Sequence, residues 1–189
     1  MGALAAQLQL GQRASVLQWQ GLAETMGGRY GVEPALILAV IEVESGGNPR
    51  AANPADPSYG LMQLLLSTAR ELAGNANLSP DDLYDPNLNV DLGTRYLAHQ
   101  LSRYGGDYAQ AISAYNAGTA TPRNQTYVHR VLAALERYRV EPTGGVPSSG
   151  DPWLEDLEDI IPTELSSVSA WVWGAGVMAL ILAWVFLRR

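Results

Sequence analysis

Several residue types are absent or scarce in this chain of 189 residues, and each absence excludes a class of site. There is no cysteine, so neither a disulfide framework nor a thiolate metal site can form. The two histidines, His99 and His129, lack companion ligands at metal-binding spacing. No phosphate-binding loop or nucleophile elbow is present. We therefore expect no metal and no cofactor.

Lysine is absent as well, and all 12 basic residues are arginine. The net charge of −7 is unevenly spread along the chain. Residues 1–140 carry 10 arginines against 12 acids, residues 141–164 carry seven acids and no base, and residues 188–189 are arginines. The acidity therefore belongs to one short segment. Since no basic patch is present to neutralise phosphates, we do not expect nucleic acid as a partner.

Hydrophobic residues recur at helical spacing through residues 17–140, which predicts one mainly α-helical domain. Residues 1–16 are expected to form an N-terminal extension that lacks the basic and apolar parts of a secretory signal. Residues 46–59 are polar and rich in Gly, Pro and Asn, which predicts an irregular segment with a short hairpin.

Capping residues predict where several helices begin and end. We expect the first helix to stop at Gly27-Gly28, and a short helix ending at Ala73 to open with a capping box of Thr68 and Glu71. A longer helix should follow Asp85-Pro86. The next helix should begin at Asp107 and be terminated by Gly118.

The final part of the sequence predicts a single membrane helix. Residues 141–167 are acidic and rich in Pro, Gly and Ser, a composition typical of flexible linkers. Residues 168–187 carry no charge, and their apolar part would span about 27 Å as a helix, close to the thickness of a bilayer core. With the basic terminus 188–189 in the cytoplasm, the domain would lie on the periplasmic or outer side. Alanines at positions 175, 179 and 183 suggest self-association of this helix.

One glutamate is placed where a carboxyl can keep its proton. Residues 35–41 are apolar on every side and predict a buried helix, and Glu44 follows near the end of that helix. Burial disfavours the charged form of a carboxyl and raises its pKa, which makes Glu44 a candidate general acid. Glu42 lies about 200° away around the helix and is interpreted as a solvated or ion-paired residue.

Two further segments accompany Glu44-Ser45 in a fixed order, namely Gly60-Leu61-Met62-Gln63 and residues 114–118, Ala-Tyr-Asn-Ala-Gly. Together these motifs resemble the lysozyme-like catalytic domain of lytic transglycosylases, over residues 17–138. The resemblance implies a helical lysozyme-like fold with a small irregular or β segment. It also implies cleavage of the MurNAc-GlcNAc β-1,4 bond of peptidoglycan with formation of a 1,6-anhydro-MurNAc end.

The resemblance further implies roles for individual residues. Glu44 would act first as acid and then as base, and Ser45 would form a hydrogen bond near it or near the N-acetyl group of the sugar. Gly60 would let the sugar approach the backbone, and Gln63 would bond it. Met62 would belong to both core and cleft wall, and the remaining contacts would come from Tyr115 beside the glutamate, Asn116 on the glycan and Tyr127 in the cleft. Leu66 stands where the family usually has proline.

Two alternatives remain open from the residues alone. A goose-type-lysozyme-like hydrolase would need a second carboxylate to activate water, and Asp56 is the residue we would nominate. A structural protein could instead hold glycan without cutting it. As to setting, we expect a bacteriophage virion component, with a bacterial membrane-bound enzyme or part of a secretion or conjugation apparatus as the other settings.

Overall fold

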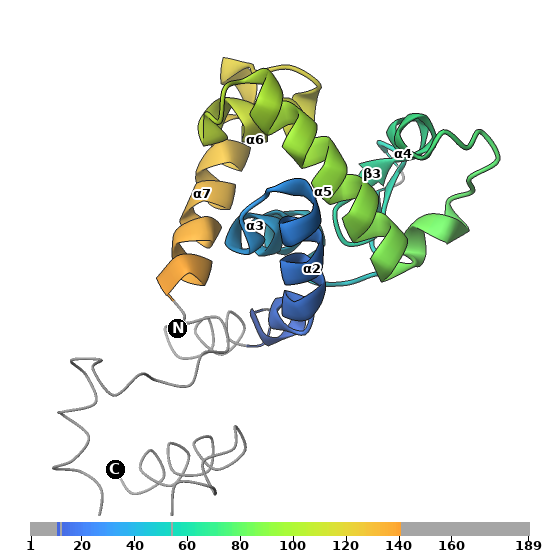
Figure 1. Ribbon diagram of the computed structural model, residues 1–189, viewed down its shortest axis with the longest axis horizontal. Coiled ribbons are helices and arrows are strands. Elements are labelled where there is room, and N and C mark those ends of the chain that lie inside the picture. The colour runs from blue at the N-terminus through green and yellow to red at the C-terminus, as the bar shows by residue number, and fades with distance from the viewer. Residues whose placement is uncertain (1–10, 12, 54, 141–189) are drawn as a thin grey trace, which may run out of the picture. The chain divides into compact units, whose positions relative to one another are not determined.

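The computed structural model describes residues 11, 13–53 and 55–140 (Figure 1). The predicted linker at 141–167, membrane helix at 168–187 and basic terminus at 188–189 lie outside these residues, as does most of the predicted extension. Within the part of the chain that the structure describes, no helix is both long and apolar enough to span a bilayer.

The described chain is mainly helical, as the sequence predicts. Its α-helices include α2 (Gln20–Tyr30), α3 (Pro34–Ser45), α4 (Leu66–Ala73), α5 (Pro86–Arg103), α6 (Tyr108–Ala117) and α7 (Gln125–Val140), with the 3₁₀ turns η1 (Asp81–Tyr84) and η2 (Pro122–Asn124). Residues 13–17 are helical as well. The irregular segment holds the predicted hairpin, and a third strand that follows it completes a small sheet. Strands β1 (Ala52–Asn53), β2 (Ser58–Tyr59) and β3 (Leu64–Leu65) form an antiparallel sheet in the order β1-β2-β3, with Tyr59 opposite both Ala52 and Leu64.

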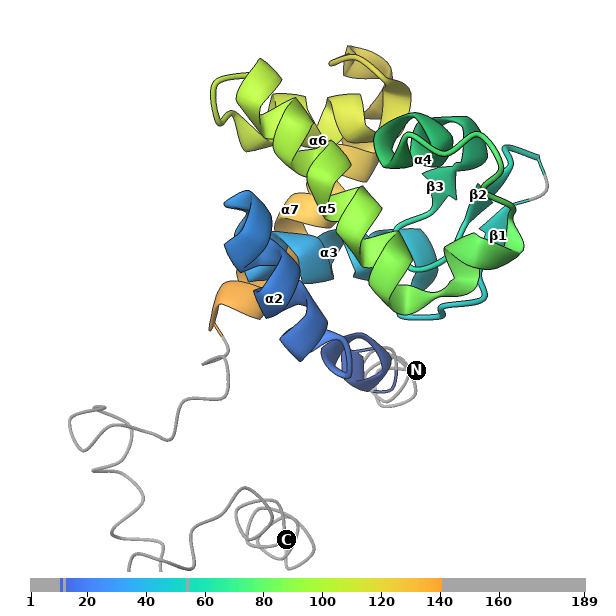
Figure 2. The same cartoon turned by 45° about the vertical axis from the view of Figure 1, so that its right-hand side comes forward.

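Helix α3 forms the centre of the core. All of residues 35–41 are buried, and α2 and α7 pack against the helix, which lies among its neighbours in both views (Figures 1 and 2). Pro34 occupies the first turn, where its missing N–H leaves no bond unmade. Each fully buried leucine or isoleucine stabilises the fold by about 1.5–3 kcal/mol. The apolar sequence of α3 therefore fixes the helix whose last turn carries Glu44.

Side-chain caps begin two helices as the sequence predicts. The Asp85 carboxylate accepts hydrogen bonds from the backbone N–H groups of Asn87 and Leu88 at the start of α5. Asp107 accepts from the N–H of Gln110 at the start of α6, and Gly118, in the left-handed conformation with φ 73°, ends that helix. These bonds satisfy N–H groups that a helix terminus otherwise leaves without partners.

Two predicted boundaries are wrong. Helix α2 continues through Gly27-Gly28 and ends at Tyr30, followed by the capping residue Gly31, which adopts φ 68°. Gly27 is needed for close packing, because a Cβ there would lie 2.5 Å from the carbonyl oxygen of Val32. Helix α4 begins at Leu66 without a side-chain cap, so the expected capping box of Thr68 and Glu71 does not form. Burial of apolar residues in a small second core around Leu83 sets this start instead.

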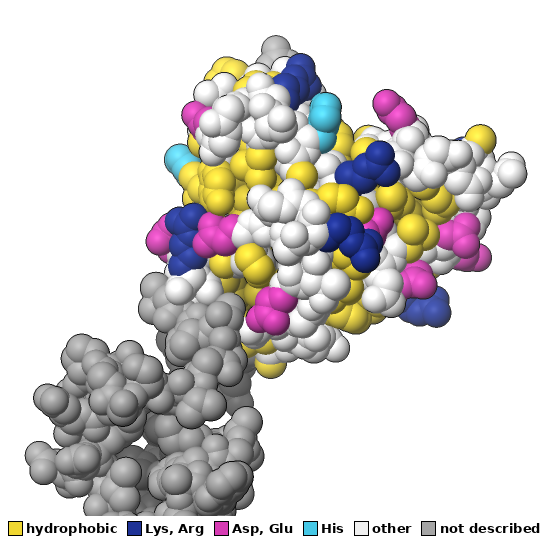
Figure 3. Space-filling model, in the orientation of Figure 1, with side chains coloured by type: hydrophobic (Ala, Val, Ile, Leu, Met, Phe, Trp, Pro, Cys, Tyr) yellow, Lys and Arg dark blue, Asp and Glu magenta, His cyan; other side chains and the backbone are white. Residues whose placement is uncertain are grey.

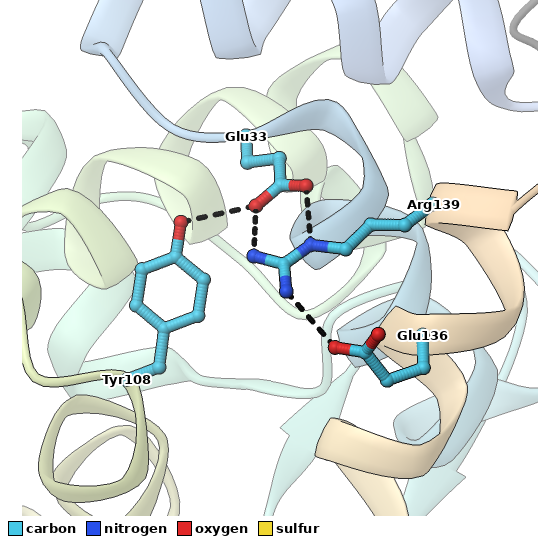
Figure 4. Close-up of polar contacts among 4 residues, drawn as sticks. All are labelled: Glu33, Tyr108, Glu136 and Arg139. Carbon is cyan, nitrogen blue, oxygen red and sulfur yellow. Dashed lines mark hydrogen bonds and ion pairs between the residues drawn. The ribbon is translucent and has the colours of Figure 1, made fainter.

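A polar cluster joins the end of α7 to the start of α3 (Figure 4). The Arg139 guanidinium donates to both carboxylate oxygens of Glu33 at 2.7 Å, and to Glu136 at 2.9 Å. The Tyr108 hydroxyl donates to Glu33 at 3.1 Å. The hydrogen bonds from Arg139 hold the pKa of Glu33 below its usual value, because they favour the charged carboxylate.

A second cluster joins α3 to α7 through Glu42. Its carboxylate accepts from the Arg137 guanidinium and, at 2.7 Å, from the Tyr138 hydroxyl. Glu42 is thus ion-paired, as predicted. The two clusters fix how α7 lies along α3, and hence which α7 side chains reach the end of that helix.

On the face of the molecule shown in Figure 3, charged side chains of both signs are interspersed with apolar ones.

Candidate functional site

An open cavity of about 910 Å³ lies where the last turn of α3 meets the sheet. Helices α4, α5, α6 and α7 contribute the remaining walls. The lining is mixed in character, with carboxyl, amide, hydroxyl and guanidinium groups beside aliphatic and aromatic ones. Among the lining residues are Glu44, Ser45, Asp56, Gln63, Tyr96, Tyr115, Asn116 and Arg130.

Glu44 lies in the last turn of α3, and its side chain lines the cavity. Burial raises the pKa of Glu44 to about 7, although the hydrogen bond from Tyr127 and the charge of Arg130 each lower it. A substantial share of the molecules therefore carries a protonated Glu44 at neutral pH. Such a group can donate its proton to a ligand in the cavity and afterwards take one back.

Tyr127, near the start of α7, holds the Glu44 carboxyl in place. Its hydroxyl donates to Oε1 of Glu44 at 2.5 Å, a short bond of the kind formed with a charged acceptor. Burial and the neighbouring Glu44 raise the pKa of Tyr127 well above its ordinary value, so the phenol remains a donor. The sequence predicts Tyr127 in the cleft, and the structure gives it a bond to the acid itself.

Tyr115 is buried beside the cavity and is bound to the backbone. Its hydroxyl donates to the carbonyl oxygen of Met62 at 2.9 Å, and its ring lies 5.3 Å from that of Tyr96. Burial raises its pKa well above the ordinary value of a phenol. Tyr115 thus ties α6 to the segment that follows the sheet's second strand, while its ring lines the cavity next to Glu44.

Gln63 lines the cavity, but its side chain already has protein partners. Its amide nitrogen donates to the carbonyl oxygens of Ala51 and Gly60, and its amide oxygen accepts from the Ser58 hydroxyl. The backbone of Gln63 adopts φ 47°, a left-handed conformation that is rare for residues other than glycine. Both amide N–H groups are occupied, so Gln63 shapes the sheet and leaves only oxygen lone pairs for a ligand.

Gly60 and Met62 are buried and pack against α5 and its neighbouring turn, and neither is among the residues that line the cavity. A Cβ on Gly60 would lie 2.3 Å from the side-chain nitrogen of Asn89 and from the carbonyl oxygen of Leu83. Met62 is fully buried and does not line the cavity, and a Cβ on Gly93 would lie 2.4 Å from its sulfur. The core part of the expectation for Met62 is thus confirmed, and the expected sugar contacts of both residues stay predictions.

Asn89, which the sequence did not indicate as a site residue, organises the turn between β2 and β3. It is fully buried in α5, where its amide oxygen accepts from the N–H of Met62 at 2.8 Å. Its amide nitrogen donates to the carbonyl oxygens of Tyr59 and Leu83. An asparagine at helical spacing among apolar residues is a detectable signal, because a buried amide requires partners.

Ser45 and Asn116 line the same cavity as the acid. The Ser45 hydroxyl donates to the carbonyl oxygen of Ile41 and accepts from the N–H of Gly47, so it stabilises the end of α3. The side-chain oxygen of Asn116 accepts from Asn124, and the residue is exposed. Of the predicted site residues, the structure therefore brings Glu44, Ser45, Gln63, Tyr115 and Asn116 to one cavity, with Tyr127 bonded to the acid.

Several cavity residues were not nominated from the sequence, above all Arg130 and Tyr96. Arg130 lies three residues after Tyr127, a spacing that places both on one face of α7 and could have indicated it. Asp56 lines the same cavity and is exposed. No group of three or more metal-binding side chains occurs among the residues that the structure describes.

A mainly helical domain that presents a glutamate with a raised pKa to an open cavity beside a small sheet is typical of the lysozyme-like class of proteins. The profile of the transglycosylase SLT domain matches residues 21–131, more than half of the chain, and the chain belongs to this family. The family resemblance inferred from the three motifs is thereby confirmed.

Two curated relatives agree with this assignment. The chain is 40% identical over 87 residues to the endo-type membrane-bound lytic murein transglycosylase A of Enterobacter sp. (strain 638). It is 38% identical, again over 87 residues, to the protein of the same name from Cronobacter sakazakii. Each match covers 43% of this chain and 42% of the relative, so the chain spans less than half the length of these proteins.

Solved structures confirm the fold. The 70 kDa soluble lytic transglycosylase of Escherichia coli matches with a TM-score of 0.59 and 26% identity, over 64% of this chain and 24% of that one. An inactive mutant of lytic transglycosylase Slt from Pseudomonas aeruginosa matches with a TM-score of 0.57 and 24% identity, over 62% and 23%. The predicted lysozyme-like helical domain with a small β segment is therefore correct.

Proposed function

We propose that this protein is a lytic transglycosylase that cleaves peptidoglycan glycan strands between MurNAc and GlcNAc. The observation that carries the proposal is Glu44, whose carboxyl has a pKa of about 7, lines an open cavity and accepts a hydrogen bond from Tyr127. Membership of the transglycosylase SLT domain family supports the same reaction.

In the proposed reaction Glu44 gives its proton to the glycosidic oxygen, and the bond between that oxygen and C1 of MurNAc breaks. Positive charge develops on the sugar ring as the bond opens. The Glu44 carboxylate then takes the proton from the 6-hydroxyl of the same sugar, whose oxygen bonds to C1 and closes the 1,6-anhydro ring. Glu44 ends protonated, and no water is consumed.

Digestion of purified peptidoglycan by the full chain, followed by mass spectrometry of the released fragments, tests this proposal. We expect anhydro-ended fragments from the wild-type protein and none from Glu44→Gln. Fragments heavier by one water would instead indicate a hydrolase and would direct attention to Asp56, with Asp56→Asn as the deciding variant. A folded protein that binds strands but releases nothing would indicate the glycan-binding role.

We also propose that residues 168–187 anchor the enzyme in a membrane, with the catalytic domain on the periplasmic side. The support is the uncharged apolar sequence followed by two arginines, and the names of the two relatives, which describe those proteins as membrane-bound. Flotation of the full chain with lipid vesicles tests the anchor. Substitution of Leu180 by Arg should abolish flotation. The phage setting stays a prediction.

A further inference from the structure

Arg130 stands out among the cavity residues because the proposed reaction has not used it. It lies on α7 one turn after Tyr127, is exposed, and lines the same cavity as Glu44. It makes no direct ion pair with a carboxylate of the described residues. Its charge therefore remains available to the cavity, unlike those of Arg137 and Arg139.

The other charged and titratable groups around Glu44 do not supply a comparable positive charge. On α3, Glu42 is neutralised by Arg137. The segment between β1 and β2 contributes Asp56, which is negative. Helices α5, α6 and α7 contribute the phenols Tyr96, Tyr115 and Tyr127. Among the described residues that line the cavity, Arg130 is the single cation.

We propose that Arg130 is a positioning residue that stabilises the Glu44 carboxylate between its two proton transfers. This inference rests on the proposed function, in which Glu44 is briefly an anion after protonating the glycosidic oxygen. The guanidinium acts through space across the cavity, while Tyr127 acts through its direct bond. Because Arg130 and Tyr127 lie on one face of α7, the clusters that fix α7 along α3 also fix the position of the guanidinium relative to Glu44.

The balance of effects on Glu44 supports this role. Burial raises the pKa of Glu44, and the positive charge of Arg130 lowers it, so the two effects oppose each other. A carboxyl that must give a proton and then take one back works best when its pKa lies near the working pH. Without Arg130 the carboxyl would be a weaker acid, and its anion would be less stable in the buried site.

The test compares pH profiles of kcat/KM on peptidoglycan for the full chain and its variants. Activity requires a protonated Glu44 and falls as the pH rises through its pKa. In Arg130→Gln we expect this fall to move to higher pH and the plateau to be lower. Arg130→Glu should move it further, and Arg130→Lys should restore the wild-type profile. The shift should shrink at high salt, because solvent ions screen an exposed charge.

Arg29→Gln is the matched control, since it removes an exposed arginine that pairs with Asp91 and lies outside the cavity lining. It should leave the pH at which activity falls unchanged. An unshifted profile in Arg130→Gln, or an equal shift in Arg29→Gln, would overturn the proposal. A loss of activity in Arg130→Gln that is confined to glycan strands with peptide stems would also overturn it, because Arg130 would then be binding a stem carboxylate.

A second measurement separates this inference from the proposed function. Carboxyl ¹³C NMR of the full chain follows the Glu44 titration directly and needs no enzymatic activity. The pKa of Glu44 should be higher in Arg130→Gln than in the wild type, and unchanged in Arg29→Gln. If peptidoglycan yields no anhydro ends while the titration shifts, the proposed reaction fails but the coupling stands. If the titration does not shift, the coupling itself is refuted.

Discussion

Two walls of the cavity are built by different physical means. The helical wall consists of residues 42–46, residues 115–118 and Arg130, and rests on the apolar helix α3, which two ion-pair clusters join to α7. The sheet wall consists of residues 51–53, 58 and 63–65, whose strands are two residues long. Such short strands are not stable by themselves, and the side-chain amides of Gln63 and Asn89 bind their backbone carbonyls.

The difference shows how a small domain divides stability and chemistry between its walls. The helical wall carries the acid and the groups that tune it, so it must keep a carboxyl buried at a fixed distance from a phenol. The sheet wall carries few charges and offers backbone and small polar groups to a ligand. Changes to the helical wall should therefore alter the reaction first, and changes to the sheet wall should alter stability first.

The largest expected effect comes from removing the acid on the helical wall. Glu44→Gln should lower kcat by about 10³–10⁴-fold, since one residue performs both proton transfers. Stability should not fall. The folded-state pKa of Glu44 is raised, so the wild type loses stability as the pH rises from the unfolded pKa towards about 7, and the amide lacks this loss. Single-turnover rates and urea unfolding at pH 5 and pH 8 provide the two measurements.

The sheet wall should respond in the opposite way to the loss of its central amide. Asn89→Ala removes the side-chain hydrogen bonds to the N–H of Met62 and to the carbonyls of Tyr59 and Leu83, which should cost about 3 kcal/mol of unfolding free energy. Urea unfolding measures this loss. At a temperature where the variant is folded, the pH at which activity falls should match the wild type, and a shifted profile would contradict the division between the walls.

Two tyrosines sharpen the comparison because they make the same kind of bond to different partners. Tyr127→Phe removes the donor to Glu44, so the pKa of Glu44 should rise, the fall in activity should move to higher pH, and kcat/KM should drop about tenfold. Tyr115→Phe removes a bond to the Met62 carbonyl, so it should cost about 1 kcal/mol of stability and leave the pH profile in place. Equal profiles in the two variants would refute the assignment.

Much of the helical wall could be predicted from the sequence, because its determinants are local. The apolar run before Glu44 predicts a buried helix, and Asp85 and Asp107 cap the helices that follow them. The sequence could predict that Glu42 forms an ion pair, but not that its partner is Arg137. The bond from Tyr127 to Glu44 joins residues 83 positions apart, so the motif resemblance could place Tyr127 in the cleft without showing what it contacts.

The sheet wall was less predictable because its contacts are not local. The Gln63 side chain reaches back 12 residues to Ala51, and Asn89 reaches 30 residues back to Tyr59. Gly60 has a clear signal as a glycine, yet only the packed structure shows that Asn89 occupies the space beside it. The same limit explains Gly27, where the expected helix stop is in fact a close contact with Val32.

The smallest expected effect concerns the cluster that fixes the far end of α7. Glu33→Gln should weaken the bond to Arg139 and cost about 0.5–1 kcal/mol at pH 7, since both side chains are partly exposed. The folded-state pKa of Glu33 is lowered, so its contribution is present above the unfolded pKa and is lost as the pH falls through the folded value. The difference between variant and wild type should therefore vanish in strongly acidic urea titrations. A difference that persists there would mean that the carboxylate charge is not what holds α7 to α3.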